Sequence, residues 1–150
     1  MSRHAFQYAV LRAVPRIERG EFVNVGVILY CQALDYLHAA VVVDDVRLRA
    51  IAEEVDLDAV RTSAEAVVAA CRHPEGTARE NTGLAHTFGR LTAPRSTVVQ
   101  PSPVHAGVTD DPARTLGTLL GKLVAPPAPG RRHRRRRRPS RRPQRPAAQR

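Results

Sequence analysis

The chain has 150 residues, enough for one domain of ordinary size, and a formal net charge of +10. The excess charge lies at the C-terminus: residues 125–150 hold 11 of the 24 basic side chains and none of the 14 acidic ones, which leaves residues 1–124 with a net charge of −1. No apolar run reaches the roughly 18 to 20 residues that a membrane-spanning helix needs, and charged residues interrupt the N-terminal stretch, so we expect neither a membrane span nor a signal peptide and predict a cytoplasmic protein.

Three strands are predicted in the first third of the chain. Residues 5–14 form the first, residues 15–20 make a turn that contains proline and glycine, and residues 21–30 form the second strand of an antiparallel hairpin. The second strand is apolar on both of its faces, which is typical of a strand covered on both sides. Strict alternation predicts one shared row for Val23, Val25, Val27 and Leu29. A third strand at 37–43 completes a meander.

Asn24 and Gly26 interrupt the apolar pattern of the second strand. A glycine inside a strand often marks a bulge, or a close approach by another backbone or a ligand. Asn24 lies one pleat away, where its amide could recognise a ligand or satisfy an internal hydrogen-bond deficit. Because buried polar groups usually have internal partners, we favour the internal role for Asn24.

Helices are predicted near 46–55, 57–73 and 112–124, with a short one that contains Leu84, Phe88 and Leu91. Acidic N-caps support the first three, and Pro112 suits the first position of the last one. Cys71 lies on the apolar stripe of the second helix, where we interpret it as a core residue. Prolines on either side restrict a further strand near 96–100 to a sheet edge and favour an extended continuation after it.

The fold class expected is α+β: a small, mainly antiparallel sheet packed against these helices in a single domain over residues 1–124. Residues 125–150 are rich in proline and arginine and lack the apolar side chains needed to build a core. We therefore predict that this C-terminal tail is disordered.

Five motifs are distinctive in this chain: Tyr-Ala-Val-Leu-Arg-Ala-Val-Pro at 8–15, Gly-Glu-Phe-Val-Asn-Val-Gly-Val-Ile-Leu at 20–29, Pro-Arg-Ser-Thr at 94–97, Ser-Pro-Val-His-Ala-Gly at 102–107 and Asp-Asp-Pro at 110–112. With these motifs the chain resembles a bacterial family catalogued as domain of unknown function 3037. The resemblance covers about residues 6–124, and the tail departs from it. Members of this family are often encoded beside HipA-like kinases, so the resemblance implies a partnership with such a kinase.

The polar residues within these motifs are the candidate ligand- or partner-binding residues: Glu21, Asn24, Arg95, Ser96, Thr97, Ser102 and His105. Arginine presents a bidentate fork and hydroxyls add donors, so such a set could bind a phosphate or a carboxylate. The alternative, which we favour, is that Arg95 pairs with Glu21 and that the hydroxyl groups cap turns.

His105 could act as a general base beside Asp110, although a lone histidine between prolines and a glycine is more often a loop residue. No cofactor or metal is predicted: the six histidines are dispersed, and neither a GxxxxGK[ST] loop nor a GxGxxG motif is present. Cys31 and Cys71 are expected to be reduced and buried.

The tail allows three interpretations. Its arginines could bind nucleic acid or another polyanion without sequence preference, form a solvated appendage, or reflect translation of a GC-rich frame. The residues assigned to such binding are Arg131, Arg132, Arg134, Arg135, Arg136, Arg137, Arg138, Arg141 and Arg142.

The leading functional hypothesis is a non-enzymatic binding or accessory module. Its motifs lie mostly at structural positions, and the resemblance implies a HipA-like kinase as its partner. The second hypothesis is non-specific association with nucleic acid through the tail. The third is an enzyme that acts on a phosphate-containing substrate through Arg95, Ser96 and His105.

Overall fold

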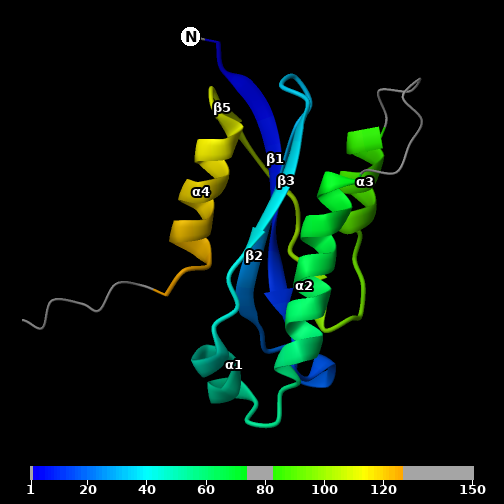
Figure 1. The fold of residues 1–150 in the computed structure, drawn as a ribbon, viewed down its shortest axis with the longest axis vertical. Coiled ribbons are helices and arrows are strands. Elements are labelled where there is room, and N and C mark those ends of the chain that lie inside the picture. Colours follow the sequence, from blue (N-terminus) through cyan, green and yellow to red (C-terminus); the bar gives the residue numbers. More distant parts are fainter. Residues whose placement is uncertain (1, 74–82, 127–150) are drawn as a thin grey trace, which may run out of the picture.

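The computed structural model describes residues 2–73 and 83–126, which form a mainly antiparallel sheet flanked by helices (Figure 1). The strands are β1 (His4–Ala13), β2 (Val23–Cys31), β3 (Tyr36–Val41), β4 (Val99–Pro101) and β5 (His105–Thr109). The helices are α1 (Asp45–Ile51), α2 (Leu57–Arg72), α3 (Gly83–Leu91) and α4 (Pro112–Leu123), with a 3-10 turn at Ile17–Arg19. The order β3-β2-β1 confirms the meander, and β4 and β5 both pair with the outer edge of β1. The α+β prediction is confirmed.

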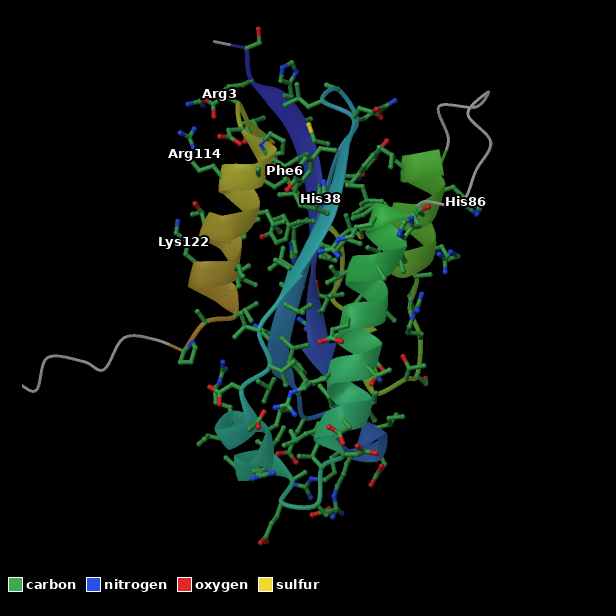
Figure 2. All side chains as sticks on the ribbon, in the orientation of Figure 1. Arg3, Phe6, His38, His86, Arg114 and Lys122 are labelled. Atoms are coloured by element: carbon green, nitrogen blue, oxygen red, sulfur yellow. The ribbon has the colours of Figure 1, made fainter. Side chains whose placement is uncertain are left out.

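The helices cover the two faces of the sheet. Helices α2 and α3 lie on one side and α4 on the other, beside the upper part of the sheet (Figure 1). Ile28 and Tyr30 of β2 are buried with α2 and α3, whereas Val27 and Leu29 are buried with α4. Figure 2 shows Phe6 between α4 and the sheet, with Arg114 and Lys122 on the outer side of that helix. The prediction that β2 is covered on both faces is therefore confirmed.

The predicted single row of β2 side chains is wrong, because a bulge divides the strand. The register with β1 shifts between Leu11 and Arg12, so that Val23 and Val25 face α2 while Val27 and Leu29 face α4. One extra residue reverses the direction of every side chain beyond it. Both roles considered for Gly26 are present here: it adjoins the bulge, and the backbone of β3 approaches it closely.

Several boundaries differ from the predicted ones. Helix α1 ends at Ile51 rather than near residue 55, and β3 ends at Val41 rather than 43. The edge strand expected near 96–100 lies at 99–101, and the extended segment after it pairs again as β5. Most residues of the predicted disordered tail lie outside the described residues, which end at Pro126.

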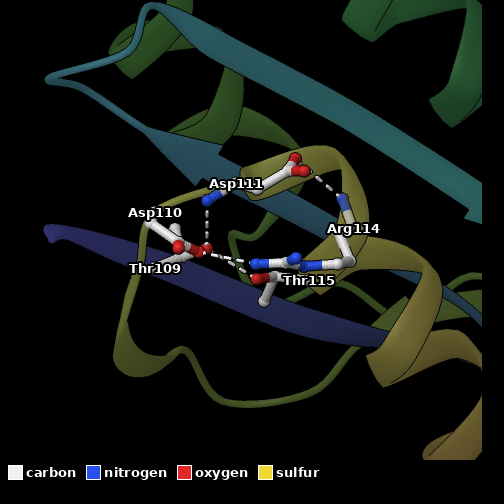
Figure 3. Close-up of polar contacts among 5 residues, drawn as sticks. All are labelled: Thr109, Asp110, Asp111, Arg114 and Thr115. Atoms are coloured by element: carbon white, nitrogen blue, oxygen red, sulfur yellow. Dashed lines mark hydrogen bonds and ion pairs between the residues drawn. The ribbon is translucent and has the colours of Figure 1, made fainter. Parts of the chain in front are cut away.

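Local hydrogen bonds explain where the helices begin. Asp44, Asp56 and Asp111 each accept a bond from the backbone N–H three residues on, as the sequence predicts for N-caps. Figure 3 shows the start of α4, where Thr109 Oγ1 also accepts from the Asp111 N–H at 3.0 Å and lies 2.6 Å from Thr115 Oγ1. These contacts fix the angle at which α4 leaves β5.

Candidate functional site

A cavity of about 290 Å³ lies between α2, the end of α3 and the segment that leads into β4. Helix α2 contributes small side chains there, with Ser63, Ala66 and Ala70 one turn apart, and this spacing leaves room against α3. Val67, Leu91 and Val99 add apolar surface. Arg90, Arg95 and Thr97 complete the lining of what we call the α2–α3 pocket.

Two candidates from the Pro-Arg-Ser-Thr motif, Arg95 and Thr97, meet in this pocket. The Arg95 guanidinium donates through Nη2 to the backbone carbonyl of Arg90 at 2.5 Å, which ties it to the end of α3. Thr97 Oγ1 donates to the Val99 carbonyl at 2.8 Å. Ser96 is exposed and does not line the pocket. The pocket thus unites an arginine and a hydroxyl with an apolar floor.

The favoured alternative for Arg95, an ion pair with Glu21, is wrong. Glu21 pairs with Arg19 instead, two residues away along the turn between β1 and β2. Arg95 is bound to a neutral carbonyl. Because the β1–β2 turn supplies a nearer arginine, Glu21 has a local partner and does not reach across the sheet.

Ser102 supports the sheet edge between β4 and β5. Its Oγ accepts the Val10 N–H at 2.8 Å, its own N–H donates to the Val10 carbonyl at 2.7 Å, and its hydroxyl donates to the Pro103 carbonyl. The side chain is 3 % exposed. The hydroxyl therefore replaces a missing backbone acceptor where proline interrupts the ladder.

Asn24 joins the sheet to the end of α4. Its Nδ2 donates to the Leu123 carbonyl at 2.9 Å, and Arg47 Nη1 holds the next carbonyl, that of Val124, at 3.1 Å. This is the internal role that the sequence favoured. Its Oδ1, however, is buried and has no hydrogen-bond partner among the described residues.

Arg12 is the cross-strand neighbour of Asn24 and points to the same face of the sheet. Its Nε is also buried without a partner in the described part of the chain, while its guanidinium carbon lies 4.2 Å from the centre of the Phe22 ring. Phe22 is 45 % exposed, and Val42, which follows β3 on that face, is 39 % exposed. We call Arg12, Phe22, Asn24 and Val42 the Arg12 surface.

His105 begins β5 and does not lie in a loop. It pairs with Tyr8, and the two ring centres are 5.2 Å apart. Asp110 follows the other end of β5, and five extended residues span about 17 Å. Its carboxylate accepts from Arg114 Nη2 at 2.8 Å (Figure 3). The two side chains are therefore not assembled as a proton-transfer pair.

Both cysteines are free and buried, as expected. Burial raises the pKa of the Cys71 thiol to about 11. Within residues 2–73 and 83–126, no three His, Cys, Asp or Glu side chains are grouped so that they could hold a metal ion. The same residues include no helix with the length and hydropathy to cross a membrane. The tail arginines assigned to nucleic-acid binding lie outside the described residues.

Sequence reasoning missed most residues of the α2–α3 pocket and of the Arg12 surface. Ser63 and Arg90 join the α2–α3 pocket from helices that only tertiary packing brings together. Phe22 was assigned to the apolar pattern of a strand, although it precedes β2 and is largely exposed. A signal for Arg12 was available, because an arginine near the end of an otherwise apolar strand requires an unusual environment.

The family comparison agrees with the motifs. Residues 8–124, from the middle of β1 to the residue after α4, match the family described as proteins of unknown function, DUF3037. No curated protein and no solved structure matches the chain. The matched span contains the α2–α3 pocket and the Arg12 surface and covers most of the sequence. The chain belongs to the DUF3037 family.

Proposed function

We propose that the chain is a non-enzymatic binding or accessory module that docks a partner protein on the Arg12 surface. The observation that carries this proposal is a pair of buried polar atoms, Arg12 Nε and Asn24 Oδ1, that have no hydrogen-bond partner within residues 2–73 and 83–126 and lie beside exposed Phe22 and Val42. A buried polar group without a hydrogen bond costs about 1 to 3 kcal/mol, so two of them on neighbouring positions need a compensating gain.

Both atoms are enclosed in the unbound chain, so a partner reaches them only after the side chains over them, the Phe22 ring among them, move aside. A peptide group would then satisfy both atoms. One atom is a donor and the other an acceptor, and a peptide group of an approaching chain offers a carbonyl for Arg12 and an N–H for Asn24. Aromatic and arginine side chains are also the commonest anchors of protein interfaces. Contact with Phe22 and Val42 would bury apolar area around the two hydrogen bonds and exclude water from them.

A HipA-like kinase is the partner that we propose. The support is the family membership, because the resemblance to this family implies a partnership with such a kinase. The partner would bring a segment with its own free peptide groups and an apolar side chain to cover Phe22. The experiment must therefore distinguish binding of the kinase from binding of another protein with the same surface chemistry.

The test is calorimetric titration of the full chain with a purified HipA-like kinase from the same organism. The variant Phe22→Ser should weaken binding at least about tenfold, because it removes the exposed apolar anchor. Val108→Ser is the matched control: this valine is 61 % exposed, but it lies on β5 and faces the opposite side of the sheet. Unchanged affinity of the Phe22→Ser variant would refute the Arg12 surface as the docking site. Absence of binding between the wild-type chain and the kinase would refute the kinase as the partner.

The other two hypotheses have less support. An enzyme acting through Arg95, Ser96 and His105 would need these side chains to converge. His105 pairs with Tyr8, whereas β4 pairs with β1 at Ala13, about 17 Å further along that strand. Nucleic-acid association through the tail depends on residues outside those described and stays a prediction.

A further inference from the structure

We propose that the α2–α3 pocket binds a small organic anion, with the charged group on Arg95 and an apolar group on the pocket floor. This site lies on the face of the sheet opposite to the Arg12 surface, because Val99 belongs to the core under α2 and α3. The pocket can therefore bind a ligand independently of partner docking on the Arg12 surface.

The charge in the pocket is suited to an anion. Among the described residues that line it there is no acidic side chain, and Arg95 contributes a positive charge. Among the described residues, the Arg95 guanidinium bonds only to the Arg90 carbonyl. A guanidinium has five N–H donors, so four remain for a ligand after this bond.

The bond to the Arg90 carbonyl also orients the arginine. An exposed arginine ordinarily loses side-chain entropy of up to about 2 kcal/mol when it is immobilised by a ligand. Because Arg95 is already tied to the end of α3, part of this cost is met in the unliganded chain. The planar fork then presents paired donors to a carboxylate or phosphate.

The floor and the volume define the rest of the ligand. Val67, Leu91 and Val99 are apolar, and the small Ala66 and Ala70 leave the space above them open. A cavity of 290 Å³ has the volume of about ten water molecules at about 30 Å³ each. One aromatic ring or a short alkyl chain with one anionic group fits this space.

The ligand chemistry is shared by organic phosphates and carboxylates, so the experiment uses one probe of each kind. Phenyl phosphate and phenylacetate are titrated separately into the ¹⁵N-labelled full chain, and backbone amide shifts are followed. We expect saturable shifts at Val67, Ala70 and Thr97. The probe with the lower dissociation constant identifies the class of head group.

Two variants that remove one positive charge each distinguish binding in the pocket from general attraction by the basic tail, because the tail is the same in both. Arg95→Gln should weaken binding at the pocket amides about tenfold, because it removes a charged hydrogen bond. Arg49→Gln removes the same charge from an exposed position on α1 and should leave this binding unchanged. Equal loss in the two variants would overturn the proposal, since it would indicate general electrostatic attraction.

A second variant tests the apolar half of the site without changing any charge. Ala66→Leu fills the space above the floor and should weaken phenyl phosphate about tenfold while it leaves the response to inorganic phosphate unchanged. Absence of shifts at Val67, Ala70 and Thr97 with both organic probes would refute the pocket as a ligand site. Undiminished binding of phenyl phosphate to Ala66→Leu would refute the assignment of its apolar group.

Discussion

The close approach of β3 to Gly26 predicts that even one added methyl group destabilises the sheet. A Cβ atom at this position would lie 2.8 Å from the Ala40 carbonyl oxygen and 2.7 Å from Val41 Cγ1. The carbonyl belongs to the backbone of β3, whose pairing with β2 resists displacement. Relief of the contact to the ordinary range above 3.4 Å requires a shift of several tenths of an ångström.

The expected effect of Gly26→Ala follows from two opposing contributions. Replacing glycine lowers the entropy of the unfolded chain, which stabilises the fold by about 0.4 to 1 kcal/mol. Overpacking against a backbone that cannot move costs about 1 to 3 kcal/mol. We therefore expect the free energy of unfolding to fall by about 1 to 2 kcal/mol, which corresponds to a urea midpoint about 1 M lower.

The control is Gly117→Ala in the middle of α4. A Cβ atom there meets nothing within 4 Å, so the substitution should raise the free energy of unfolding by about 0.5 to 1 kcal/mol through helix propensity. The two alanine variants should thus shift the urea midpoint in opposite directions. A Gly26→Ala chain as stable as the wild type would show that β3 yields to the added atom, and would refute the reasoning.

Three further predictions concern Ser102, Cys71 and the tail. Ser102→Ala leaves the buried Val10 N–H without its acceptor and should lower the free energy of unfolding by about 1 to 3 kcal/mol. Ser96→Ala, at an exposed position, is the control and should change the free energy of unfolding by less than about 0.5 kcal/mol. Equal urea midpoints of the two variants would contradict this role of Ser102. Burial raises the pKa of Cys71 from 9.0 to about 11, so the unfolded chain loses its proton first and stability should fall between these pH values by at most about 1.4 kcal/mol per pH unit. Cys71→Ala should remove this part of the pH dependence, and identical pH slopes in the two chains would refute it. The arginine-rich tail should bind duplex DNA with an affinity whose logarithm falls against the logarithm of the salt concentration, at a slope of about −0.9 per phosphate contact. Removal of residues 127–150 should abolish this binding. An affinity as high at 0.3 M as at 0.05 M salt would refute the electrostatic mechanism.

Locally encoded features were predictable from the sequence. An aspartate before an apolar stripe located the start of α2, and Asp111 with Pro112 located the start of α4, because capping depends on neighbours within one turn. The β1–β2 hairpin followed in the same way from the turn residues between its strands. These contacts are short in sequence, so a single chain is enough to infer them.

Features that depend on pairing between distant segments were not predictable. Gly26 indicated a bulge, but the side to which Val27 and Leu29 turn depends on where β1 resumes its register. The candidate site shows the same limit. Arg95 and Thr97 are close in sequence and could be expected together, whereas Ser63 joins them only because α2 packs along α3.

The side-chain amide of Asn24 connects the Arg12 surface to the end of α4. Its Nδ2 already donates to the Leu123 carbonyl, and its Oδ1 is the atom that a partner would bond. A donor brought to Oδ1 polarises the amide and strengthens the bond that Nδ2 makes. Docking on the Arg12 surface would therefore tighten the last turn of α4, at the point from which the chain continues into its arginine-rich segment. This coupling requires no movement of the sheet, because a single planar group carries it.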